Sequence, residues 1–345
     1  IRIYDSALSA ENVTSLYNEI ECPAVAVTNA FNTVLYTGNG TTQSITSLNF
    51  APDFTWIKQR TDTFFHILQD SVRGAGKTLF SNATNAESGN ANDLISSFDT
   101  NGFTVNTNYN GTTNNDSTNK NNFTYVAWNW KAGGPAVQNT EGTTTSQVSA
   151  NVDAGFSIVK YTAGGAANVG HGLDSAPELI ITKNIDTSEQ WFVYSAATGL
   201  QKFLGLNTTT AATSNSGVYT SVTDTAFTNN ISSTSRTYIN YCFHSVADYS
   251  KVGSYVGTGG NQTIYVGFEP RFVLIKRATG GSLNGWVLSD SERGAGINLF
   301  ANTSGAEADE TAYGPTSFTS SGFTLAQAGG NTNISGSTYI FMAIA

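Results

Sequence analysis

Short blocks of consecutive apolar and aromatic residues recur along the chain, separated by Gly, Asn, Asp and Ser about every 8–12 positions. Three such blocks are Phe54–Ile57, Leu179–Thr182 and Phe272–Ile275. A strand with one face in solvent alternates apolar and polar residues, whereas these blocks are nearly continuously apolar, which predicts central strands covered on both faces. We find no long amphipathic helical period. The pattern therefore predicts an all-β chain.

The chain also contains an internal repeat. Asp70–Asn82 recurs as Asp290–Asn302, and the same offset matches Gly102–Thr104 with Gly322–Thr324. A more diverged copy lies between them. In each copy a Pro precedes a Lys by six positions, and these pairs are Pro52/Lys58, Pro177/Lys183 and Pro270/Lys276. Each copy also opens on a Tyr (Tyr36, Tyr161, Tyr255) and closes on Thr-Tyr (Thr124-Tyr125, Thr237-Tyr238, Thr338-Tyr339). Repeated units of this size predict a tandem architecture.

These boundaries predict three tandem antiparallel β-sandwich or jelly-roll-like units. We expect repeat 1 over residues 30–133, repeat 2 over 153–248 and repeat 3 over 249–345. Residues 134–152, rich in Gly and Thr, are expected to form a polar linker. Residues 1–22 differ in kind from the repeats and predict one strand and a short helix.

Composition and charge exclude some classes of binding partner. Charged residues make up only 12 % of the chain, and the formal net charge is −9 without any run of Lys or Arg. Such a balance repels a phosphate backbone, so nucleic acid is not expected as a partner. The longest apolar runs fall far short of the roughly 20 residues of a membrane-spanning helix, so we expect no membrane insertion. Cys22 and Cys242 are too few for a disulfide framework.

One turn carries candidate chemistry. Gly74–Thr78 superficially resembles a phosphate-binding loop, but Ser71 stands where that motif requires Gly, and the third repeat replaces Lys-Thr with Ile297-Asn298. A tight glycine turn is the favoured interpretation. Beside it, Asp70 with Arg73 and Asp290 with Arg293 are spaced to form ion pairs that fix the turn. A ligand-binding role for these two pairs is the alternative.

Catalytic and metal sites find little support. His66, His171 and His244 occur at unlike positions, with no zinc-ligand spacing and no nucleophile-elbow sequence, so we expect no metal, no cofactor and no enzyme. Glycoside hydrolysis needs two carboxylates flanking the sugar. The repeat supplies one per unit, Glu87 and Glu307, although two units could combine theirs.

Sugar binding without cleavage is easier to support, because aromatic faces and uncharged hydrogen-bonding side chains suffice for it. Trp56, Trp191 and Trp286 fall inside repeat strands and are expected in the core. Trp128 and Trp130 alternate on one strand. Core is the favoured position for them, and an exposed ligand-binding face is the alternative.

Two resemblances bear on function. Arg2–Val13 with Leu16-Tyr17 resembles the last strand and closing helix of laminin-G-like (concanavalin A-like) jelly rolls, which implies that the rest of such a domain precedes Ile1. Tyr161-Thr162, His171–Leu173, Ala176-Pro177 and Thr237–Ile239 resemble uncharacterised repeat domains of tailed-phage virion proteins, especially marine ones.

The second resemblance implies a virion appendage, such as a tail fibre or tailspike, and it brings no catalytic residues with it. We therefore expect a protein of the virion surface that serves adhesion to host glycans or receptors, alongside other virion proteins and as a homo-oligomer, with a trimer as the first choice. A structural spacer or capsid decoration protein is the first alternative. A polysaccharide-degrading tailspike is the second.

Overall fold

The computed structural model describes residues 27–90, 93–109, 116–280, 285–309, 313–326 and 331–345. Within these ranges the regular structure is antiparallel strand, apart from one short helix, α2 (Asp116–Asn119). The predicted all-β sandwich architecture is confirmed. The N-terminal segment 1–22, with its laminin-G-like motif and Cys22, lies outside the described residues.

Repeat 1 pairs a large inner sheet with a small outer one. The large sheet has the order β1 (Phe31–Thr37), β7 (Thr124–Trp130), β3 (Phe54–Gln59), β4 (Ile67–Asp70). The small sheet has the order β2 (Gln43–Ile45), β6 (Gly102–Val105), β5 (Ile95–Asp99). A hydrophobic layer that includes Ile57, Phe103 and Ala127 fills the space between the two sheets.

Repeats 2 and 3 have the same strand order. In repeat 2 the large sheet contains β10 (Phe156–Ala163), β18 (Arg236–Phe243), β12 (Leu179–Asn184) and β13 (Phe192–Ser195), and the small sheet β11 (Ala167–Gly170), β17 (Ala226–Asn229) and β16 (Ser221–Val222). A separate pair joins β14 (Lys202–Phe203) to β15 (Thr213–Ser214). In repeat 3 the large sheet contains β19 (Ser250–Val256), β27 (Thr338–Ile344), β21 (Phe272–Arg277), β22 (Trp286–Asp290), β23 (Ile297–Phe300) and β24 (Ala308–Asp309), and the small sheet β20 (Gln262–Tyr265), β26 (Gly322–Leu325) and β25 (Pro315–Thr319).

The first and last strands of each repeat are hydrogen-bonded neighbours. Their tyrosines lie opposite each other and stack with ring centroids 5.0, 5.3 and 5.0 Å apart, in the pairs Tyr36–Tyr125, Tyr161–Tyr238 and Tyr255–Tyr339. Cross-strand aromatic pairs of this kind stabilise a sheet. The opening Tyr and the closing Thr-Tyr of the sequence pattern are therefore the two halves of one contact.

One local expectation was wrong. Residues 134–152 contain a hairpin, β8 (Val137–Asn139) and β9 (Ser146–Asn151), which extends the large sheet of repeat 2 beside β10. Alternation along β9 explains the strand, because Val148 is buried whereas Gln147 is exposed. Just before β4, strand register places His66 at the position that Trp191 and Trp286 occupy in the other repeats.

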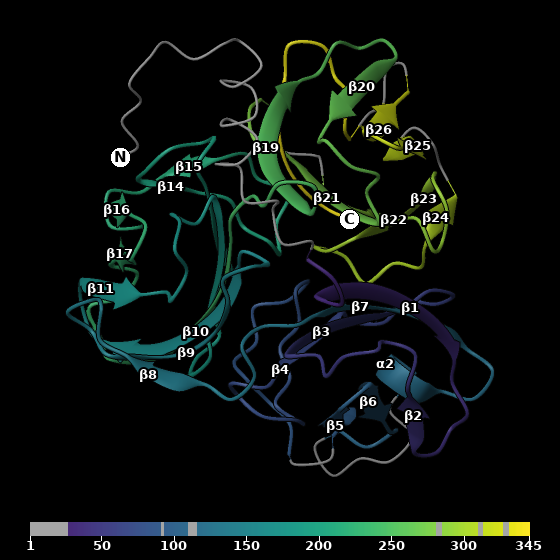
Figure 1. The fold of residues 1–345 in the computed structure, drawn as a ribbon, viewed down its shortest axis with the longest axis horizontal. Helices are drawn as coiled ribbons and strands as arrows, with labels where there is room; N and C mark the ends of the chain where they lie inside the picture. Colours follow the sequence, from purple (N-terminus) through teal and green to yellow (C-terminus); the bar gives the residue numbers. More distant parts are fainter. Residues whose placement is uncertain (1–26, 91–92, 110–115, 281–284, 310–312, 327–330) are drawn as a thin grey trace, which may run out of the picture.

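The three repeats surround one shared core. Figure 1 shows the large sheets facing the centre of the molecule and the small sheets at its periphery. The shared core contains aromatic residues from all three repeats, including Trp130, Phe243 and Phe272. Each large sheet is therefore buried on both faces, as the continuous apolar blocks predict.

Candidate functional site

Three equivalent contacts close the repeats into a ring. The indole of Trp191 in repeat 2 donates from Nε1 to the carbonyl of Phe80 in repeat 1 at 2.9 Å, and Trp286 in repeat 3 donates to Gly205 in repeat 2 at 2.7 Å. His66 completes the ring with Nε2 3.1 Å from the Phe300 carbonyl. Because His66 Nδ1 accepts from the Trp56 indole at 2.9 Å, the ring proton must lie on Nε2. We call the three contacts the 1–2, 2–3 and 3–1 interfaces.

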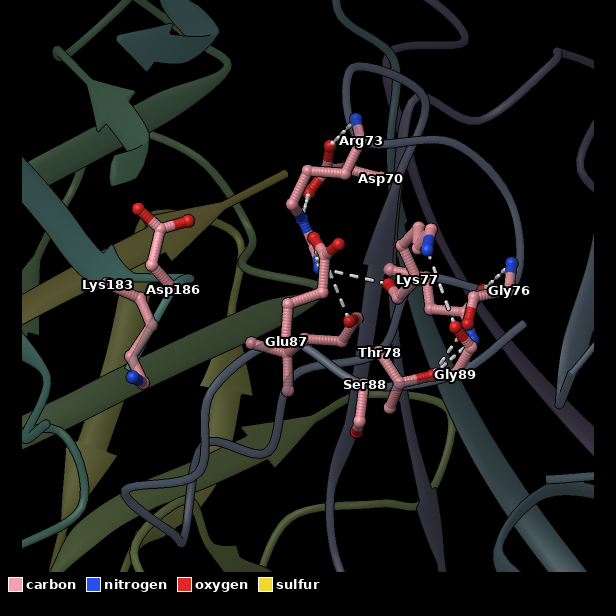
Figure 2. A network of polar contacts seen from close by, with 12 residues as sticks. Asp70, Arg73, Gly76, Lys77, Thr78, Glu87, Ser88, Gly89, Lys183 and Asp186 are labelled. Atoms are coloured by element: carbon pink, nitrogen blue, oxygen red, sulfur yellow. Dashed lines mark hydrogen bonds and ion pairs between the residues drawn. The ribbon is translucent and has the colours of Figure 1, made fainter. Parts of the chain in front are cut away.

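A buried polar cluster lies at the 1–2 interface (Figure 2). Asp70 and Arg73 form the predicted ion pair, with Nε 2.5 Å from Oδ2, and the Arg73 amide donates to Oδ1 at 2.8 Å. From repeat 2, the Tyr241 hydroxyl donates to Asp70 Oδ2 at 2.8 Å. The Asp70 and Arg73 side chains are fully buried, and Glu87 lies 3.3 Å from Arg73 Nη1. Burial, together with the charge of Asp70, raises the pKa of Tyr241, so its hydroxyl stays protonated.

The 3–1 interface repeats this cluster with a different partner. Arg293 Nε lies 2.7 Å from Asp290 Oδ2, and the Trp128 indole of repeat 1 donates to the same oxygen at 3.0 Å. The Arg293 guanidinium lies 5.4 Å from the Trp128 ring centroid, a cation–π contact. Glu307 binds Arg60 of repeat 1 through two hydrogen bonds of 2.8 and 2.9 Å. Both Asp–Arg pairs therefore act in structure, at the joints between repeats.

The glycine turn between Arg73 and Thr78 has no free nest of amide donors. Gly74 and Gly76 have φ of 96° and 82°, which permits the tight turn. The Gly76 amide donates to Ile95 O and to Gln69 Oε1, both at 2.9 Å, and the Thr78 amide donates to Ser88. Phosphate-binding loops instead direct several amides at the ligand. The tight-turn interpretation fits this geometry.

The two ligand-binding candidates of the sequence lie inside the shared core. Trp128 is 0 % and Trp130 is 2 % exposed. Trp128 binds Asp290 as described, and Trp130 packs on Phe31, with ring centroids 4.9 Å apart. Alternation along β7 does not expose one face, because the large sheet has a sandwich layer on one side and the other repeats on the opposite side. The favoured core position of these two residues is therefore confirmed, and the alternative, an exposed ligand-binding face, is wrong.

The histidines and the described cysteine have structural surroundings. His171 Nδ1 accepts from the Leu173 amide and Nε2 lies 3.1 Å from the Thr223 carbonyl. Burial raises the pKa of Cys242, which leaves its thiol protonated and unreactive. In the part of the chain that the structure describes, no group of three His, Cys, Asp or Glu side chains is placed to hold a metal ion.

Three buried lysines occupy equivalent positions near the interfaces. Lys58 and Lys183 each donate from Nζ to the carbonyl of the following residue at 2.6 Å, and Lys276 donates across the 2–3 interface to Thr209 at 2.8 Å. Burial lowers the pKa of each to about 8. The Pro-to-Lys spacing of the sequence thus marks the buried ends of the central strands.

The outer faces of the small sheets carry uncharged hydrogen-bonding side chains in all three repeats. In each repeat one cross-strand pair at the equivalent position is polar on both strands: Ser44/Thr104, Asn168/Thr228 and Thr263/Thr324. The first two pairs are hydrogen-bonded at 2.9 Å. Figure 1 shows these sheets at the periphery, away from the shared core.

Repeat 3 adds a cleft and an aromatic ring to this face. The cleft has a volume of about 450 Å³ and is lined by Asn261, Gln262, Thr263, Thr316, Thr324, Leu325 and Ala326. Tyr265, two residues from Thr263 on β20, therefore projects from the same face and is 75 % exposed. The sequence signal for this site was the alternation Thr263-Ile264-Tyr265, in which only Ile264 is buried.

Comparison with known proteins identifies a family. Residues 26–345 match the model of a domain of unknown function, DUF7483. The chain belongs to the DUF7483 family. No curated protein matches the sequence significantly. The match spans all three repeats, so one DUF7483 domain corresponds to the whole ring. Among the described residues no helix is long and apolar enough to cross a membrane.

Proposed function

We propose that this DUF7483 chain is an adhesion module of a phage virion surface, which recognises host glycans through the outer faces of its small sheets. The observation that carries the proposal is the cleft of repeat 3. In the part of the chain that the structure describes, its polar lining consists of amide and hydroxyl side chains without a charged group, and the exposed Tyr265 ring lies on the same face.

This combination suits a carbohydrate. Sugar hydroxyls both donate and accept hydrogen bonds, as do the side chains of Gln262, Thr263 and Thr324. An exposed tyrosine offers an apolar ring face, while its hydroxyl stays in water. The buried ring of interfaces supports the proposal indirectly, because a rigid scaffold holds peripheral loops and sheets in fixed positions.

A glycan array probed with the whole chain, followed by binding to susceptible host cells, tests the proposal. We expect binding to a restricted set of glycans and at least a tenfold loss in Tyr265→Ala. Thr46→Ala is the matched control, since Thr46 is the equivalent residue of repeat 1, and it should bind as the parent chain does. Absence of binding to every glycan and every susceptible cell would refute the proposal.

A structural spacer or decoration protein is the second candidate. The closed ring of buried interfaces favours it, because a stiff module resists deformation within an assembly. Localisation by electron microscopy on particles, with and without the chain, separates the two: loss of particle integrity without loss of attachment supports the spacer. The expected homotrimer also stays a proposal, and the mass of the whole chain in solution decides it.

Polysaccharide cleavage is less well supported by the carboxylates. Glu87 contacts Arg73, and Glu307 contacts Arg60 and lies 3.7 Å from Arg293. Each acid is thus engaged by arginine at a different interface, whereas a glycosidase needs two carboxyl groups about 5–10 Å apart around an open site. Release of reducing sugar from host polysaccharide would revive this alternative.

A further inference from the structure

Repeat 1 has an aromatic pocket that lies apart from the cleft of repeat 3. Its volume is about 250 Å³, and its lining consists of Phe65, Phe80, Asn85, Leu94, Tyr109 and Ser117. The rings of Phe65 and Phe80 are 5.0 Å apart at their centroids, and Tyr109 meets Phe80 edge-on at 6.0 Å. Among the described residues, no charged side chain lines it.

One wall of this pocket is aromatic and exposed to solvent. Phe65 is 47 % exposed, whereas Leu94 at the lining is fully buried. Covering the exposed half of this ring with a ligand would be favourable by roughly 1 kcal/mol or more. Phe65 contacts Phe80, and both rings line the pocket.

Comparison of the three repeats shows that Phe65 has no aromatic equivalent in repeats 2 and 3. The residue equivalent to Phe65 is Gln190 in repeat 2 and Gly285 in repeat 3. A side chain on Gly285 would meet Phe300 Cδ1 at 2.9 Å and Asn302 Oδ1 at 2.7 Å, so repeat 3 is closed at this place. The structural role of the position is therefore met without an aromatic residue, and Phe65 needs another explanation.

The size of the pocket limits the ligand. Ligand pockets for drug-sized molecules have volumes of about 300–1,000 Å³. At about 30 Å³ per water molecule, this pocket holds the equivalent of about eight waters, which suits one sugar ring or part of one. An oligosaccharide would have to extend across the surface beyond it.

The chemistry of the lining selects among sugars. The aromatic rings and Leu94 offer apolar contact to a methyl group, while the exposed Asn85 side chain carries one amide donor group and one carbonyl acceptor. An acetamido group presents the complementary set: a methyl, an N–H and a C=O. A plain hexose offers only the C–H groups of its ring to the apolar surface, and it has neither a methyl group nor an amide.

We propose that this pocket binds the acetamido group of an N-acetylated hexosamine. The inference rests on the proposed glycan-binding function and names the sugar class and the second site. Phe65 and Tyr109 contact the methyl group and the sugar ring, and Asn85 hydrogen-bonds the amide. Tyr109 is held for this by its hydrogen bond to Ser88, with the two hydroxyl oxygens 2.5 Å apart.

The test is titration of the whole chain with N-acetylglucosamine and, as the matched ligand, glucose, followed by NMR or calorimetry. We expect N-acetylglucosamine to bind at least tenfold more tightly than glucose. Phe65→Ala should weaken it at least tenfold, and Phe65→Trp should retain it. Leu35→Ala removes another partly exposed apolar side chain and should change nothing. Equal affinity for the two sugars, or unchanged affinity in Phe65→Ala, would overturn the inference.

The array separates this inference from the proposed function. If glycans bind and only Tyr265→Ala reduces binding, the adhesion function stands and the acetamido pocket is wrong. If no glycan binds, and N-acetylglucosamine fails as well, both are wrong. Thermal unfolding of Phe65→Ala serves as the folding control, and we expect it to match the parent because the ring is half exposed.

Discussion

Two of the three interfaces in this ring are built around a buried Asp–Arg ion pair, and the third is not. At the 1–2 and 3–1 interfaces an Asp and an Arg from one repeat meet a polar aromatic side chain from the next. The equivalent residues at the 2–3 interface are Ser195, Thr198 and Met342. The two kinds of interface occupy the same backbone framework.

The replacements at the 2–3 interface are coordinated. Without the Asp–Arg pair there is no acceptor for a polar aromatic residue, and Met342 stands where Tyr241 and Trp128 stand in the other repeats. The third acid is also missing, because Ala212 occupies the position of Glu87 and Glu307: all three donate a main-chain hydrogen bond to the neighbouring repeat. A buried charge left without its partner is strongly destabilising, so the whole set is present or absent together.

The ring of repeats therefore closes without needing an Asp–Arg cluster at every interface. Main-chain bonds of 2.8 to 2.9 Å and the ring-nitrogen contacts occur at all three interfaces. Replacing a buried ion pair by apolar groups is often neutral or stabilising. We infer that the clusters specify which repeat packs against which, and that general packing supplies the stability.

The largest expected effect comes from removing the acid of one cluster. Asp290→Ala leaves the Arg293 guanidinium, the Arg293 amide and the Trp128 indole without their shared acceptor in a fully buried site. We expect a loss of about 3–5 kcal/mol in the free energy of unfolding, as for other broken buried ion pairs. Urea denaturation followed by tryptophan fluorescence measures it.

Ser195→Ala is the matched control at the 2–3 interface. Ser195 occupies the position of Asp290 and is fully buried, and its Oγ has no hydrogen-bond partner among the described residues. Its removal should change the unfolding free energy by no more than about 0.5 kcal/mol. Equal losses of unfolding free energy in the two variants would show that the 3–1 interface, with its ion pair, and the 2–3 interface, without one, contribute alike to stability.

Sequence reasoning reached the repeated sheet architecture because strand patterns are local. The Pro-to-Lys blocks and paired tyrosines are read from neighbouring residues, and the Asp–Arg ion pairs are only three positions apart. What escaped prediction depends on packing between repeats. For Trp128 the sequence favours the core without excluding the surface, because nothing in β7 reveals that a second repeat covers its outer face.

The candidate sites were harder still. Tyr265 could be predicted as exposed from alternation along β20, but the cleft beside it requires β25 and β26 to come together. The pocket at Phe65 draws on residues as far apart as Phe65 and Ser117. The hairpin in 134–152 was missed because its polar Gly/Thr turn dominated the composition of the segment.

Alkaline pH should affect all three interfaces alike. Lys58, Lys183 and Lys276 have a folded-state pKa of about 8, against 10.5 in an ordinary setting. Between these values the unfolded chain binds more protons, so the free energy of unfolding rises with pH. The rise from pH 7 to 9 should be about 1 kcal/mol per lysine. Above pH 10 the buried tyrosines, whose pKa values are raised, oppose it.

Replacing one lysine at a time sharpens this test. Lys58→Met, Lys183→Met and Lys276→Met should each remove about one third of the rise, measured by urea denaturation at pH 7, 8 and 9. Equal shares are expected because desolvation by burial is the main cause of the lowered pKa at each site. A rise that persists undiminished in all three variants would contradict the assignment.

The smallest expected effect distinguishes the two charged interfaces from each other. Acid should destabilise the 3–1 interface first. There the side chain that hydrogen-bonds a carbonyl of the neighbouring repeat is His66, which can be protonated, whereas tryptophans make this contact at the other two interfaces. Burial and the neighbouring charge of Lys58 hold the pKa of His66 well below 6.5. Below that pH the unfolded chain takes up a proton that the folded chain refuses, so stability falls as pH falls, with a limiting slope of about 1.4 kcal/mol per pH unit.

Protonating His66 at Nδ1 would also remove the acceptor of the Trp56 indole. The acid effect should therefore be confined to the 3–1 interface and should spare the 1–2 interface. Hydrogen exchange at pH 5.5 should therefore show faster exchange around His66 and Phe300 than around Trp191 and Phe80. His66→Gln cannot titrate, and its amide can both accept from Trp56 and donate to Phe300. This variant should lose less stability as the pH falls than the parent chain does. The loss that remains is the one expected from His171, whose pKa is also lowered by burial. If the unfolding free energy of His66→Gln fell with decreasing pH as steeply as that of the parent chain, the acid response would arise elsewhere. The difference between the histidine at the 3–1 interface and the tryptophans at the other two would then have no effect on stability.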